Sequence, residues 1–150
     1  MNSRNDVEYR LKLAKGFLDE AEEDFNLKRW RSCVDNSQLV VENAGKAILM
    51  LFGISPKTHE PARHLAQLIH NHGIPRPIRD KVKDILPDFL ALGVEEHFMT
   101  DYGDESSYTL PWDMFNEESA KSALYAARLC KSASEDIVEQ VHKWRAEQNE

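Results

Sequence analysis

The chain has 150 residues, of which 41% are hydrophobic and 30% are charged, and its formal net charge at pH 7 is −7. This length suits one domain with a buried core, and no apolar run approaches the roughly 18 residues of a membrane span. The acidic charge argues against general binding to DNA, because contact with a nucleic-acid backbone needs a basic surface. The first ten residues lack the apolar core of a signal peptide, so we expect a cytoplasmic protein with no membrane contact.

Two long amphipathic helices are predicted in the first third of the chain. Apolar side chains recur at alternating four- and three-residue steps before Leu27 and again from Trp30 to Leu51. The connection between the two runs is short, so the helices should pack antiparallel. The apolar face of the second helix is wide enough for more than one neighbour, which predicts a place at the centre of a bundle.

Three further helices are expected, with an irregular segment before the last. Pro61 suits the first turn of a short helix, and Pro87 should kink or split the next one because it cannot donate a backbone hydrogen bond. Small residues line the last helix, which predicts close packing on another helix of this chain or of a second subunit. The expected fold is all-α, a five-helix up-and-down bundle in one domain over residues 1–150, with helices at about 5–27, 30–52, 62–72, 76–100 and 117–146.

The middle of the second helix resembles a known family. An apolar-flanked glutamate, Glu42, is followed four residues later by Lys46 and then by an alanine and an isoleucine, an order similar to the signature of the HEPN (higher eukaryotes and prokaryotes nucleotide-binding) domain family. The resemblance covers most of the chain, continuing through Gly53, Thr58-His59, Leu65, Leu68, Tyr102-Gly103-Asp104 and the alanine-rich start of the last helix.

This resemblance implies a five-helix bundle that is usually a homodimer. Many members of the family are encoded beside a minimal nucleotidyltransferase and act with it as a toxin–antitoxin pair. Many are metal-independent RNA endonucleases that use an arginine and a histidine, four to six residues apart, brought together across the dimer. Others lack these residues and are regarded as binders of nucleotides, RNA or a partner protein.

The family's catalytic pair is missing at its usual place in this sequence. The end of the fourth helix and the loop after it contain His97 but no arginine, and Asp101 stands where relatives often have arginine before the tyrosine. Arg63 and His70 have a similar spacing and would share a face of the third helix, although about one such match is expected by chance. Catalysis would need the histidine as acid or base and the arginine to hold the phosphate. Arg63, His70 and His97 are therefore the catalytic candidates.

Five residues at positions of the family's motifs are candidates for binding a nucleotide or a partner: Glu42, Lys46, Asp101, Tyr102 and Asp104. Without the resemblance, the first two form a surface i,i+4 pair worth a few tenths of a kcal/mol. The aromatic residues of segment 100–116 could stack on a base, or could hold that segment on the bundle.

No metal or other cofactor is expected. The sequence has no HExxH and no Cys-x-x-Cys, and the histidines between residues 59 and 72 are scattered around a short helix. Cys33 and Cys130 lie on apolar helix faces, as reduced core residues do.

Two functions of different class follow from the sequence. The first is a HEPN-like homodimeric module that binds a nucleotide, RNA or a minimal nucleotidyltransferase partner without cleaving RNA. The alternative is a metal-independent RNA endonuclease toxin of a toxin–antitoxin pair, with its arginine and histidine displaced. The acidic charge and the missing pair favour the first.

Overall fold

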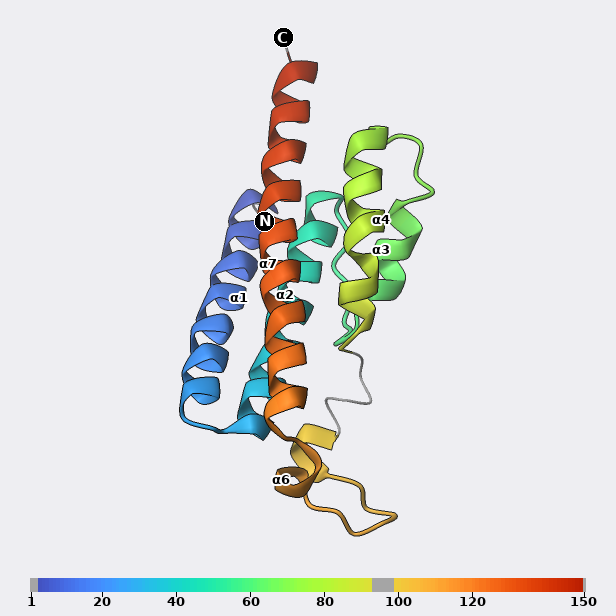
Figure 1. The fold of residues 1–150 in the computed structure, drawn as a ribbon. Coiled ribbons are helices and arrows are strands. Elements are labelled where there is room, and N and C mark those ends of the chain that lie inside the picture. Colours follow the sequence, from blue (N-terminus) through green and yellow to red (C-terminus); the bar gives the residue numbers. More distant parts are fainter. Residues whose placement is uncertain (1–2, 93–98, 150) are drawn as a thin grey trace.

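A computed structural model describes residues 3–92 and 99–149 of the chain (Figure 1). These residues form helices and loops, with one isolated antiparallel bridge between Asp104 and Thr109 in place of any β-strand. The all-α prediction is confirmed. The helices, in chain order, are α1 (Ser3–Asn26), α2 (Trp30–Leu51), α3 (Ala62–Leu68), α4 (Arg76–Leu90), α6 (Pro111–Met114) and α7 (Glu117–Gln148).

Helix α2 is the centre of the bundle, as its wide apolar face predicts. Helices α1 and α7 pack along it, and α3 with α4 form a second pair that packs on α2 and α7 (Figure 1). The chain reverses between α1 and α2 within three residues, so these two helices are antiparallel. None of the helices in the described ranges is both long and apolar enough to cross a membrane.

The contact between α2 and α7 is close because small residues face each other. Ala44 of α2 and Ala127, Cys130 and Ser134 of α7 are fully buried. The Ser134 hydroxyl donates a hydrogen bond of 2.9 Å to the Ala44 carbonyl oxygen. The stripe of small residues on the last helix thus packs on α2 of the same chain.

Several expected helix bounds are wrong. Helix α3 ends at Leu68 instead of residue 72. The backbone N–H groups of His70 and Asn71 donate to carbonyl oxygens three residues earlier, as in a 3₁₀ turn, and do not continue the α-helix. Helix α4 ends at Leu90 instead of residue 100, and it runs through Pro87 without splitting, since a missing donor in the last turn leaves the earlier turns intact.

The segment expected to be irregular contains the short helix α6, so a count of five helices is also wrong. The start of this segment is anchored by Thr100, which is fully buried and donates a hydrogen bond of 3.1 Å to the Asp35 carboxylate. Arg31 donates another, 2.8 Å long, to the Thr100 carbonyl oxygen. Tyr108 contributes little to this anchoring, since it is 92% exposed.

Candidate functional site

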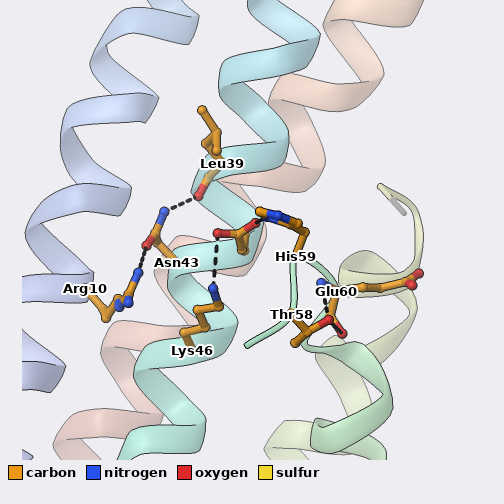
Figure 2. A network of polar contacts seen from close by, with 8 residues as sticks. Arg10, Leu39, Asn43, Lys46, Thr58, His59 and Glu60 are labelled. Atoms are coloured by element: carbon orange, nitrogen blue, oxygen red, sulfur yellow. Dashed lines mark hydrogen bonds and ion pairs between the residues drawn. The ribbon is translucent and has the colours of Figure 1, made fainter. Parts of the chain in front are cut away.

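A buried ion pair lies halfway along α2. The Lys46 ammonium is 3.3 Å from a carboxylate oxygen of Glu42, and both side chains are only 12% exposed. The sequence spacing correctly predicts that the two side chains meet one helical turn apart. The interpretation as a solvent-exposed surface pair is wrong, because the loop after α2 covers this part of the helix (Figure 2).

His59 of that loop completes the group. Its Nδ1 atom lies 2.7 Å from the second carboxylate oxygen of Glu42, while the imidazole remains 69% exposed. An ionised carboxylate can only accept hydrogen bonds, so Nδ1 carries the proton in this contact. Nε2 is then the ring atom that takes up or gives a proton, which is the arrangement of a histidine oriented for acid–base chemistry.

Two local features hold the loop against α2. The Thr58 hydroxyl accepts a hydrogen bond of 3.0 Å from the Glu60 backbone N–H, which fixes the turn that presents His59. Two residues later, Pro61 packs on Gly45 so closely that a Cβ at Gly45 would lie 2.4 Å from the proline Cγ. A glycine at this position of α2 therefore permits the close approach that brings His59 to Glu42.

A second polar contact lies next to the first on α2. The Arg10 guanidinium of α1 donates a hydrogen bond of 2.9 Å to the Asn43 side chain, whose amide donates in turn to the Leu39 carbonyl oxygen (Figure 2). Arg10 also lines a cavity of about 470 Å³ together with Tyr9 and Ser55. This cavity is large enough for a small ligand.

The catalytic candidates are not assembled in the described part of the chain. Arg63 lies in the first turn of α3, and His70 lies beyond the end of that helix, so the shared helical face expected for them does not form. Arg63 and His70 are both exposed, and the described residues contain no hydrogen bond that links them. His97 lies outside the described residues.

The remaining binding candidates lie apart from Glu42 and Lys46, on the segment anchored by Thr100. Tyr102 is exposed and lines a cavity of about 470 Å³ with Met99 and Asp104. Asp101 is exposed beside it. The Asp104 carboxylate accepts hydrogen bonds from the hydroxyl and backbone N–H of Ser106. Hydrogen bonds from Ser106 and Ser107 lower the pKa of Asp104, so this carboxylate stabilises its own turn.

In the described ranges no three histidine, cysteine or acidic side chains are grouped as metal ligands. Cys33 and Cys130 are buried and free. Burial raises the pKa of the Cys33 thiol to about 11 and also raises the pKa of Cys130. Neither thiol has the low pKa of a nucleophile.

Comparison with known proteins identifies the family. A family model described as the HEPN domain matches residues 7–137. The chain belongs to the HEPN domain family. "Putative toxin MJ1304" of Methanocaldococcus jannaschii is 26% identical to this HEPN protein in an alignment of 141 residues that covers 89% of each chain.

Solved structures with the same fold include two further proteins. TT1696 from Thermus thermophilus has a TM-score of 0.65 and 19% identity, over 89% of this chain and 98% of that one. ST0689, an archaeal HEPN homologue, has a TM-score of 0.57 and 19% identity, over 87% and 97% of the two chains. These likenesses concern the fold alone.

Sequence reasoning on this HEPN domain misses three members of the site. It includes His59 only in a loose histidine group and in the family's Thr-His pair, and it does not include Arg10 or Asn43. A signal for His59 is available, since a glycine turn, a threonine and a histidine directly follow the helix that carries Glu42. No sequence signal joins Arg10 to Asn43, because their contact depends on how α1 and α2 pack.

Proposed function

We propose that this protein is a HEPN module that binds a nucleotide, RNA or a minimal nucleotidyltransferase partner as a homodimer, without cleaving RNA. One observation carries the proposal: within one chain, the candidate pair Arg63 and His70 is not brought together on a shared helical face. Arg63 and His70 are both at the surface, and the end of α3 lies between them. Phosphodiester cleavage needs the acid–base group and the phosphate-holding group at one place, within hydrogen-bond reach of the reacting atoms.

The site favours binding for a second reason. Glu42 and Lys46 neutralise each other in a nearly buried pair, and Arg10 is engaged with Asn43. Side chains that are already fixed lose little further conformational entropy when a ligand or partner binds against them, which favours binding. The cavity beside Arg10 adds an exposed tyrosine ring and a serine hydroxyl for a ligand or a partner side chain.

The alternative is an RNA endonuclease toxin, and the contact between His59 and Glu42 favours it. A histidine oriented by a carboxylate is a competent general base. The name of the relative from Methanocaldococcus jannaschii also includes the word toxin. In that case His59 would act with an arginine from a second subunit.

The deciding experiment is RNA cleavage by the purified protein in the presence of a chelator. We expect no cleavage above background from a chain that elutes as a folded dimer in size-exclusion chromatography with light scattering, together with measurable binding of labelled RNA or of the partner. Variants His59→Ala, Arg63→Ala, His70→Ala and His97→Ala run beside the wild type, with His72→Ala as the control for an exposed histidine in the same region. Cleavage lost in His59→Ala and kept in His72→Ala would overturn the proposal and establish the endonuclease.

A further inference from the structure

A cleft of about 380 Å³ lies where the turn between α1 and α2 meets α6. The turn and the first residues of α2 supply one wall. Trp112 of α6 and Phe115, the residue that follows α6, supply the other. None of its lining residues belongs to the group around Glu42 in Figure 2. Figure 1 shows the turn from α1 into α2 and helix α6 at the same end of the bundle.

The wall from the turn is basic, although the protein as a whole is acidic. Lys28, Arg29 and Arg31 all line the cleft. Arg29 is paired with Asp24, whose carboxylate lies 3.7 Å away and also accepts a hydrogen bond of 2.8 Å from Asn36. Within the described ranges Lys28 forms no ion pair, and none of the residues that line the cleft is acidic. An anionic group entering the cleft would be attracted.

Arg31 is fixed in place and keeps a donor unused. One of its terminal nitrogens donates to the Thr100 carbonyl oxygen, and the other lies 3.3 Å from the Ser32 hydroxyl. Its Nε atom is buried and finds no hydrogen-bond partner in the part of the chain that the structure describes. Each terminal nitrogen also carries a second N–H besides the one in these contacts, and a guanidinium held at a cleft in this way is suited to receive a phosphate oxygen.

The opposite wall offers an aromatic platform. Trp112 is 68% exposed although its ring is large and apolar, and the Arg31 guanidinium carbon lies 5.8 Å from the ring centroid. Trp30 packs edge-on against Phe25 with 5.3 Å between ring centroids and so belongs to the core side of the cleft. An exposed tryptophan beside cations is the combination that stacks on a nucleobase while its phosphate is neutralised.

We propose that this cleft binds a ribonucleotide, with the base on Trp112 and the phosphate against Lys28, Arg29 and Arg31. The volume suits one base with its sugar and phosphate. An acidic peptide would use the cations but would leave the tryptophan without a role. The choice of a ribonucleotide as the ligand rests on the proposed function. The rest of the inference does not, because binding in this cleft involves neither the Glu42 group nor the absence of RNA cleavage.

The test uses the full chain and two probes, 5′-AMP by calorimetry and a 5′-phosphorylated, 3′-fluorescein hexaribonucleotide by anisotropy. We expect Lys28→Ala/Arg29→Ala and Trp112→Ala each to weaken binding about tenfold. The matched controls are Lys12→Ala/Lys121→Ala, which removes two exposed lysines elsewhere, and Tyr125→Ala, which removes an exposed ring of α7. Circular dichroism melting checks that every variant is folded. Adenosine without phosphate should bind at least about tenfold more weakly than 5′-AMP.

The outcomes separate the sources of the ligand and the two proposals. Displacement of the RNA by 5′-AMP supports a free nucleotide, and RNA binding that 5′-AMP does not displace supports an RNA strand. Either conclusion requires that the cleft variants lose binding affinity and that the control variants keep it. Equal affinities in cleft and control variants, or no binding of either probe, would overturn the inference. So would cleft variants that lose only a co-purifying protein partner. Cleavage of RNA by the wild type would contradict the proposed function and leave this result standing.

Discussion

His59 and Glu42 are joined by a contact of 2.7 Å between the imidazole Nδ1 and a carboxylate oxygen, across 17 residues of sequence. The contact exists because the loop after α2 folds back onto the helix that it has just left. It converts an ordinary i,i+4 pair of α2 into a three-residue group in which Glu42 is shared by an ammonium and an imidazole. The stability of this group and the packing that permits it can both be measured.

The Lys46→Met variant should lose stability because it leaves the nearly buried Glu42 carboxylate with one partner fewer. We expect the free energy of unfolding to fall by about 1–3 kcal/mol. The matched control is Lys15→Met, whose pair with Asp19 is 3.0 Å long but about two-thirds exposed on both sides. That change should cost less than about 0.5 kcal/mol. Urea denaturation at neutral pH measures both, and equal losses would contradict the burial of the Glu42 pair.

Two glycines in helix interiors should respond oppositely to alanine. At Gly45 a Cβ would lie 2.4 Å from Pro61 and 3.1 Å from the Phe89 ring, whereas at Gly16 it would meet nothing within 4 Å. Gly45→Ala should therefore cost about 1–3 kcal/mol by overpacking, more than its gain in helix propensity. Gly16→Ala should stabilise the protein by about 0.5–1 kcal/mol. Thermal and urea unfolding decide the signs, and a stabilising Gly45→Ala would refute the close seat of the loop.

The contact between α2 and α7 should tolerate removal of a hydroxyl better than added volume. Ser134→Ala loses the hydrogen bond to the Ala44 carbonyl oxygen and should cost about 1 kcal/mol. Ser134→Leu places a large side chain between the two helices and should cost clearly more, about 1–3 kcal/mol beyond the alanine variant. Ser132→Ala, at an exposed position of the same helix, should stay within about 0.5 kcal/mol of the wild type. If the leucine variant were as stable as the alanine variant, the helices could not be in close contact.

The sequence predicts best what depends on local spacing. The stripes of α1, α2 and α7 repeat over many turns, and the small-residue stripe of α7 correctly indicates close packing on another helix but not on which one. The ends of α3 and α4 are set by single hydrogen bonds in the last turns, which periodicity does not report.

The candidate site is only partly predictable for a related reason. The meeting of Glu42 with Lys46 follows from helix geometry, but the burial of the pair depends on the fit of Pro61 against Gly45. That fit is a contact between residues far apart in sequence. Family resemblance groups the binding candidates Asp101, Tyr102 and Asp104 with Glu42, and the structure places them on a separate segment.

The two buried thiols should make the protein less stable in alkali. Burial raises the folded-state pKa of Cys33 from 9.0 to about 11 and raises that of Cys130 in the same direction. Above about pH 9 the unfolded chain loses thiol protons that the folded chain keeps, so the free energy of unfolding falls as pH rises through this window. Below about pH 9 the contribution is fully present and flat. Urea unfolding between about pH 8 and about pH 10.5 should show this decline, and the decline should be shallower in Cys33→Ala/Cys130→Ala, since lysines and tyrosines titrate in both proteins.

The same burial predicts slow thiol chemistry in the folded state. Iodoacetamide at about pH 8 should alkylate the native protein far more slowly than the urea-unfolded chain, because the reactive thiolate is suppressed and both sulfur atoms are buried. Mass spectrometry of timed samples assigns the rate to each cysteine. Alkylation of either cysteine at the unfolded rate would show that α7 opens from the bundle, since Cys33 contacts the start of α7 and Cys130 lies within it.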